Sequence, residues 1–300
     1  MNPASLSTAA APAATPTARS FTANRFFPML RLALRATQAT GGRLAARAAA
    51  RVFCTPVPTK LATRHIRPPR GVWMERLPFE GASLTLYRWS APEGAPLVLL
   101  THGWGGWGLQ MAPLADALQA AGYAVVAVDQ PGHGRSAGWQ STLPQFVRAL
   151  EYLGHRLGPL AALVGHSMGG ASALAALARG MSAHRLVVVA APTDLVQVTR
   201  EYAAVFGLHE TTRAAMVRHL EAREAIVFEK LNAAHLAPRV PQPALVVHDA
   251  ADTAVPLREG LRMAALLPQA RLLVTEGLGH RRVLKDPSVA QAVVRFVAGQ

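Results

Sequence analysis

The chain has very little cysteine, few acidic residues and no recognisable metal-binding pattern. Cys54 is the single cysteine among 300 residues, so the chain cannot form an internal disulfide, and we expect this residue to be structurally incidental. The 11 histidines are scattered and match no H-E-x-x-H or paired C-x-x-C pattern. We therefore expect neither a metal ion nor a cofactor.

Acidic residues are missing altogether from the N-terminal quarter. The formal net charge is +14, but residues 1–74 hold 11 Lys and Arg, and the first acidic residue is Glu75, which leaves +3 for the rest. The chain as a whole is 51% apolar, which is enough for one large core, and a domain of about 230 residues with an extension fits the length. We expect a disordered tail over residues 1–24 and a basic, helix-rich extension over 25–70.

The extension places its arginines four residues apart, which stacks them on one face of a helix. Arg31 and Arg35 form one such set, and Arg43, Arg47 and Arg51 form another. Arginine interrupts the apolar stretches, so neither a secretory signal nor a spanning helix of about 20 apolar residues is expected. Two alternatives stay open with equal weight, a helix resting on anionic lipid and an arm packed on its own domain.

No nucleic-acid recognition motif accompanies this charge, so we expect no nucleic-acid partner. The expected location is cytoplasmic, with peripheral membrane contact through the extension as an alternative.

From about residue 75 short apolar runs alternate with segments of helical period. We expect strands at SLTLYRW, PLVLLTHG, YAVVAVDQPG, AALVGHS, RLVVVAAP, PALVVHD and RLLVTEG. Most are continuously apolar and rich in β-branched residues, as in parallel strands that are buried on both faces. Helical segments between them predict an α/β fold with a doubly wound, mostly parallel sheet flanked by helices.

Polar signatures stand where these strands end. The strands lead into THGWGG, DQPGHGRS, GHSMGG, DAADTAVP and GLGHRR. Catalytic and binding groups of such sheets gather at the carboxyl ends of the strands. The stretch VGHSMGGAS favours either a close-packed turn of small residues or a nucleophile held on a bend.

The sequence resembles the α/β-hydrolase family over about residues 75–300. GHSMG is similar to the family's nucleophile elbow G-x-S-x-G, a tight turn between a strand and a helix, and HGWGG and GLGHRR match further family positions. The resemblance implies that Ser167 is the nucleophile and that the partners follow in the order serine, acid, histidine. His280 takes the histidine position, and His166 is expected to be a packing residue.

The acid is less settled than the other two residues. Asp252 matches the family's D-x-x-V-P position, but Asp249 stands three residues earlier, where glycine is common. Asp194 is a second competitor, because some relatives take the acid from that earlier strand end. Its other role would be to cap a helix. Asp129 is expected to order the PGHG turn.

The resemblance also implies an oxyanion hole formed by the backbone N–H groups of Trp104 and Met168. Trp104, Trp107 and Trp139 fall on loops at the catalytic edge and are the candidate substrate-binding residues. A small helical lid is expected over about residues 194–240. Outside the site, Trp73 and Trp89 are expected in the core.

The expected activity is hydrolysis of a small-molecule carboxylic ester or thioester with an apolar acyl or aromatic group, through an acyl-serine. The same machinery supports acyl transfer, peptide cleavage and perhydrolysis, and a catalytically silent binding protein is the alternative from another class.

Overall fold

The computed structural model describes residues 27–40, 42–56 and 59–300, so the expected tail over residues 1–24 lies outside the described part. Its helices are α2 (Phe27–Thr40), α3 (Gly42–Phe53), α4 (Thr59–Thr63), α5 (Ala112–Ala120), α6 (Leu143–Leu157), α7 (Met168–Ala178), α8 (Leu195–Phe206), α9 (Glu210–Glu224), α10 (Ala233–Leu236), α11 (Leu257–Leu266), α12 (Gly279–Arg282) and α13 (Pro287–Val297). Its strands are β1 (Val72–Phe79), β2 (Ala82–Trp89), β3 (Leu97–Thr101), β4 (Ala124–Asp129), β5 (Ala162–His166), β6 (Leu186–Val189), β7 (Ala244–Asp249) and β8 (Ala270–Thr275).

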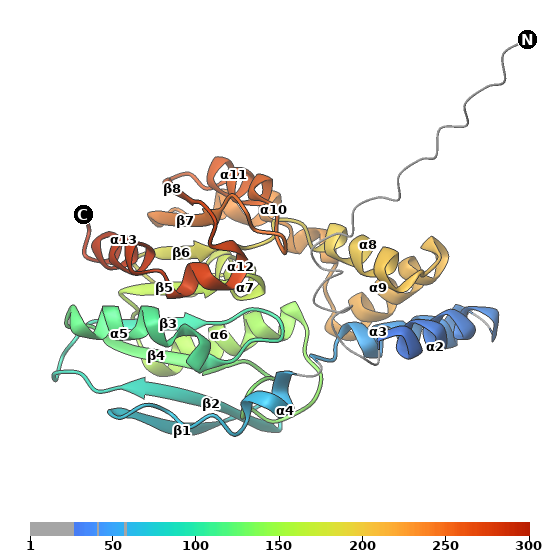
Figure 1. Ribbon diagram of the computed structural model, residues 1–300, viewed down its shortest axis with the longest axis horizontal. Coiled ribbons are helices and arrows are strands. Elements are labelled where there is room, and N and C mark those ends of the chain that lie inside the picture. The colour runs from blue at the N-terminus through green and yellow to red at the C-terminus, as the bar shows by residue number, and fades with distance from the viewer. Residues whose placement is uncertain (1–26, 41, 57–58) are drawn as a thin grey trace, which may run out of the picture.

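These strands form one eight-stranded sheet in the order β1-β2-β4-β3-β5-β6-β7-β8. Strands β3 to β8 pair in parallel, whereas β1 pairs with β2 and β2 with β4 in antiparallel fashion. Helices cover both faces, with α5 and α13 on one and α6, α7 and α11 on the other (Figure 1). The predicted doubly wound, mostly parallel sheet is therefore confirmed.

The central strands are apolar on both sides because each side meets a helix layer. Strand β6 reads LVVV and is buried at every position, and β5 is buried throughout as well. Strand β1 was not predicted, because VWMERLPF mixes apolar and charged residues along an exposed edge. The expectation that Trp73 belongs to the core is wrong, since its side chain on this edge is 50% exposed, whereas Trp89 is buried.

The N-terminal helices α2 and α3 pack on the segment between β6 and β7. Helix α3 contacts α9 and α2 contacts α8, to one side of the sheet (Figure 1). Alanines on one side of α3, together with Cys54, join Tyr202 and Phe206 in a buried apolar cluster. The Tyr202 hydroxyl donates to the carbonyl of Ala49 at 3.0 Å. We call α2, α3 and the residues up to Pro56 the arm.

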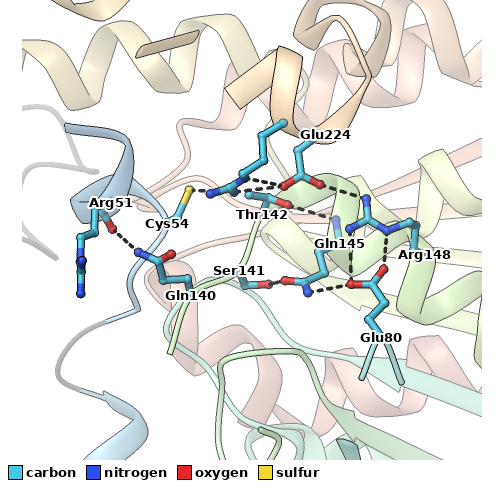
Figure 2. A network of polar contacts seen from close by, with 10 residues as sticks. Arg51, Cys54, Glu80, Gln140, Ser141, Thr142, Gln145, Arg148 and Glu224 are labelled. Carbon is cyan, nitrogen blue, oxygen red and sulfur yellow. Dashed lines mark hydrogen bonds and ion pairs between the residues drawn. The ribbon is translucent and has the colours of Figure 1, made fainter. Parts of the chain in front are cut away.

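Cys54 takes part in this packing and is not incidental. Figure 2 shows the polar network around it. An Arg223 N–H on α9 lies 3.5 Å from the Cys54 sulfur, and the Ser141 N–H donates to the Cys54 carbonyl at 2.8 Å. Burial raises the pKa of the thiol, so Cys54 stays protonated at neutral pH.

The same network continues from α9 to the sheet domain. Arg148 on α6 pairs with Glu224 on α9 at 2.9 Å and with Glu80 in the turn after β1 at 2.5 Å (Figure 2). Arg148 is only about two-fifths exposed and bridges two carboxylates, so the ion pairs hold α9 in a fixed place beside α6. The arm is thereby attached to α9, and α9 to the sheet domain.

Removal of residues 1–56 is expected to lower both stability and activity on a soluble ester. The segregation of charge in the sequence alone predicts that residues 1 to about 60 can be removed without loss of activity on soluble esters. The deletion instead exposes the apolar cluster under α3 and removes Phe53 and Pro56 from the walls of the cavity described below. The free energy of unfolding and the hydrolysis rate are the measurements.

Two point variants separate a packing effect from general damage in this experiment. Ala49 is fully buried, so Ala49→Glu should loosen the arm in the same direction, whereas the exposed Arg47→Ala should change stability by less than about 0.5 kcal/mol. Full activity and stability of the deleted chain would contradict a structural role for the arm.

Candidate active site

Ser167 lies on a sharp turn between β5 and α7. Its backbone has φ 55° and ψ −125°, a conformation that a residue with a Cβ rarely adopts. Its N–H donates to the Val189 carbonyl on β6 at 2.8 Å, which fixes the turn. A side chain at Gly165 would come within 2.4 Å of the Gly169 carbonyl oxygen, so only glycine allows strand and helix to approach this closely.

His280 and Asp252 are brought to Ser167 from two other strand ends. The His280 Nε2 lies 3.0 Å from the Ser167 Oγ, and the His280 Nδ1 lies 2.8 Å from the Asp252 Oδ2. Asp252 follows β7 and is buried, and His280 is the second residue of the short helix α12 after β8. Because Asp252 accepts from Nδ1, the lone pair on Nε2 is directed at the serine hydroxyl.

Backbone N–H groups hold the Asp252 carboxylate in place and keep it ionised. Its Oδ1 accepts from the N–H groups of Ala254 at 2.7 Å and Val255 at 2.9 Å. Burial alone would raise the pKa of Asp252, but the hydrogen bond and charge of His280 and these two N–H groups outweigh it and lower the pKa below its ordinary value. Asp252 is therefore ionised at neutral pH.

The competing carboxylates lie near the site without contacting His280. Asp249 accepts from Thr275 Oγ1 and from the N–H groups of Ala251, Leu278 and Gly279, at 2.7–3.0 Å. Burial opposes ionisation here too, but these donors lower the pKa of Asp249 below its ordinary value. Asp249 thus fastens the loop that precedes His280.

Asp194 and Asp129 take structural places. Asp194 caps α8 by accepting from the Gln197 N–H at 2.9 Å, which is the alternative role expected for it. Asp129 accepts from the Arg135 N–H at 2.7 Å, as expected for a residue that orders the PGHG turn, and also from the Gly108 N–H at 2.6 Å.

The loop after β3 lies directly on the serine. A Cβ built at Gly103 would be 2.6 Å from the Ser167 Cβ, so glycine is required there, and Gly106 N–H closes a turn on the Gly103 carbonyl at 3.0 Å. Trp104 lies inside this turn, and Met168 is the first residue of α7. In the described chain neither the Trp104 nor the Met168 N–H donates to a protein acceptor.

Three buried histidines hold these loops in place, and sequence reasoning missed their roles. His102 Nδ1–H donates to the Gly103 carbonyl at 2.7 Å, since its Nε2 accepts from the Gln130 N–H. His133 Nε2 accepts from the Gly105 N–H at 3.0 Å. These two rings therefore shape the turn that carries Trp104.

His166 acts on the histidine loop in the same way. Its Nε2–H donates to the His280 carbonyl at 2.8 Å, and the two rings lie 4.7 Å apart. The packing role expected for His166 is thus accompanied by a specific hydrogen bond to the backbone of His280. The hydrogen-bond partners of these three histidines are all backbone atoms, and the positions of the histidines after strands were the one available signal.

Acidification is expected to destabilise the fold through these histidines. Burial lowers the pKa of His133 to about 4 and that of His166 to about 3, and it lowers the pKa of His102 as well. An unfolded histidine titrates near about 6.5, so below that pH the unfolded state binds more protons than the folded state. Stability is therefore complete above about pH 6.5 and falls as the pH approaches 4, by up to about 1.4 kcal/mol per pH unit for each histidine.

Urea unfolding between pH 7 and pH 4.5 checks this expectation. His133→Asn and His166→Asn should start less stable and show a shallower loss on acidification, because each lacks one titrating ring. The exposed His65→Asn serves as the control and should parallel the wild type. Identical pH slopes in all four proteins would contradict the assignment.

A cavity of about 240 Å³ opens beside Ser167. The lid segment, residues 194–240, contributes Leu195, Val198 and Phe228, and the arm contributes Phe53 and Pro56. The wall of the cavity is mostly apolar, and Arg258 and Arg281 also border the cavity. An apolar group next to a serine hydroxyl fits such a space better than a charged one.

The predicted substrate-binding tryptophans are only partly brought together. Trp104 lines the cavity and packs edge-on against His133. Trp107 and Trp139 are not among its described lining residues, so a role in substrate binding stays a prediction for both. Trp107 precedes the short 3₁₀ helix Gly108–Met111, and Trp139 is 56% exposed with the Lys60 ammonium 5.2 Å above its ring.

Comparison with known proteins identifies the family. A family model described as "alpha/beta hydrolase fold" matches residues 96–206, and a second model, described as "TAP-like protein", matches residues 227–299. Together with the sheet order and the solved structures below, these matches show that the chain belongs to the α/β-hydrolase family.

A curated relative is the pimeloyl-[acyl-carrier protein] methyl ester esterase of Xanthomonas axonopodis pv. citri. It is 29% identical over 247 residues, which cover 68% of this chain and 95% of the relative. Among solved structures, Est1E from Butyrivibrio proteoclasticus with ferulic acid bound is 20% identical with a TM-score of 0.60, covering 75% of this chain and 98% of that one. A bacterial membrane phospholipase A is 21% identical with a TM-score of 0.59, covering 92% and 98%.

No helix within residues 27–40, 42–56 and 59–300 is long and apolar enough to cross a membrane.

Proposed function

We propose that the protein hydrolyses carboxylic esters or thioesters through an acyl intermediate on Ser167. The observation that carries this proposal is the chain of contacts from Ser167 through His280 to Asp252, at 3.0 and 2.8 Å. A serine hydroxyl is a weak nucleophile at neutral pH unless a base lies within hydrogen-bond reach, and the base needs an acceptor that fixes its tautomer.

In the first step the Ser167 Oγ attacks the substrate carbonyl carbon, and His280 Nε2 takes the hydroxyl proton. The carbonyl oxygen becomes an oxyanion, for which the N–H groups of Trp104 and Met168 are the proposed donors. When the tetrahedral intermediate collapses, the bond to the leaving group breaks and His280 returns the proton to the leaving alcohol or thiol. Asp252 stabilises the imidazolium between these two transfers.

Water completes the reaction in the second step. His280 takes a proton from the water as its oxygen attacks the acyl carbon, and the proton then returns to Ser167 as the acid leaves. The apolar wall contributed by the lid segment and the arm suits the acyl or aromatic group of the substrate. The curated Xanthomonas relatives, named as methyl ester esterases, are consistent with ester hydrolysis.

A series of p-nitrophenyl esters with acyl chains of increasing length tests this proposal. We expect hydrolysis with a burst of p-nitrophenol and a preferred chain length set by the cavity. Thioesters of the same acyl groups give the second comparison. The absence of turnover on both series, in a protein that still binds the acyl product, would contradict hydrolysis and favour a binding protein.

A further inference from the structure

The outer side of the arm is apolar where a surface helix is ordinarily polar. On α2 the buried residues Phe27 and Leu34 mark the inner side. On the opposite side, Met29, Leu32, Ala33 and Ala36 follow the spacing i, i+3, i+4, i+7 and are all exposed. Met29 is 71% exposed and Leu32 is 69% exposed. A stripe of this kind normally faces a core and not solvent.

Helix α3 presents cations beside this stripe. Its buried alanines face α9, and its exposed side carries Leu44, Arg43, Arg47 and Arg51. Helices α2 and α3 pack on α8 and α9 with their buried sides (Figure 1), so their exposed sides face away from these two helices. We call the residues Met29, Leu32, Ala33, Ala36, Arg43, Leu44, Arg47 and Arg51 the outer arm surface.

The arginines of this surface are uncompensated. None of the arginines of the outer arm surface forms an ion pair within the described residues, although Arg148, Arg179, Arg213 and Arg223 elsewhere in the chain do so. Residues 1–74 contain no Asp or Glu at all. Arg31 and Arg35 add positive charge beside Gly207, at the end of α8.

We propose that the outer arm surface binds to anionic lipid membranes. Exposed leucine and methionine can enter the boundary between headgroups and acyl chains, while arginines beside them attract the negatively charged headgroups. Arginine side chains also reach from an apolar helix face to the level of the headgroups. A nucleic acid would use the arginines but would leave the apolar stripe in water. The proposal does not depend on the hydrolase activity.

The test uses the full-length protein and vesicles of phosphatidylcholine with or without half phosphatidylglycerol. We expect the protein to sediment with the anionic vesicles at low salt, and to do so far less at about 0.5 M salt, because salt screens the arginines. Met29→Gln/Leu32→Gln and Arg43→Gln/Arg47→Gln should each weaken the partition by about tenfold.

The control variant makes one change of each kind, apolar and cationic, on another helix. Leu261→Gln/Arg262→Gln alters an exposed leucine and arginine of α11 and should bind within about twofold of the wild type. All variants should match the wild type in the rate of hydrolysis of a soluble ester or in the temperature of unfolding. If one of the two arm variants misfolds, the other arm variant decides the result.

Several outcomes would overturn the proposal. These are absence of binding to anionic vesicles, equal binding to pure phosphatidylcholine, and equal losses in the arm and control variants. A dimer in solution that Met29→Gln/Leu32→Gln dissociates, without vesicle binding, would show that the surface joins two copies of the chain.

Discussion

Ser167→Ala is expected to lose about 10⁶-fold in kcat while the fold stays intact, because nucleophile removal in a serine hydrolase has an effect of that size. Alanine fits the turn because the hydroxyl does not hold the backbone in place. The Ser167 Oγ contacts His280, and the strained backbone at φ 55° does not depend on it. The measurement is the hydrolysis rate of a p-nitrophenyl ester, with folding checked by circular dichroism.

Ser172→Ala provides a matched control in the same elbow. This buried serine donates to the Gly169 carbonyl at 2.8 Å and lies one turn further along α7, so its loss should cost about 1 kcal/mol of stability and little activity. A Ser167→Ala variant that keeps more than about one part in a thousand of wild-type activity would contradict the assignment of the nucleophile.

Asp252→Asn is expected to lose about 10⁴-fold in kcat. The asparagine can still accept from the N–H groups of Ala254 and Val255, but it no longer holds the charge that stabilises protonated His280. If the amide nitrogen faces His280, the ring also takes the wrong tautomer for accepting the serine proton. The assay is the same soluble ester under single-turnover conditions.

Asp249→Asn and Asp194→Asn are the matched carboxylate variants. Neither side chain contacts His280, so both should keep most of the activity. Asp249→Asn should nevertheless lower the free energy of unfolding by about 1–3 kcal/mol, because an amide cannot accept from all four donors around Asp249. A 10⁴-fold loss in either of these variants, with Asp252→Asn active, would show that the carboxylate changed in that variant, and not Asp252, is the partner of His280.

The sheet could be predicted from sequence because its strands are buried on both faces. Runs such as LVVV in β6 have no polar side, and parallel strands between two helix layers require this. The edge strand β1 could not be predicted in the same way, since VWMERLPF has one exposed side and no strict alternation. The exposure of Trp73 has the same cause.

The candidate site was predictable where a motif fixes the chain order and was missed where loops meet in space. Ser167, Asp252 and His280 each follow a strand, so the parallel sheet brings them to one edge. The histidine contacts were missed because His166, for example, bonds a carbonyl 114 residues away. The packing of the arm could not be predicted from the sequence either, because the alanines in α3 do not specify which helix covers them.

Labelling with a fluorophosphonate probe, followed by peptide mass mapping, is the most direct test of the proposed acyl-serine mechanism. The probe phosphonylates a serine only when a neighbouring base makes its hydroxyl nucleophilic. We predict one adduct per chain, located on Ser167, which disappears in Ser167→Ala and forms much more slowly in Asp252→Asn. A protein that stays unlabelled, or carries the adduct on another residue, would contradict the proposed mechanism.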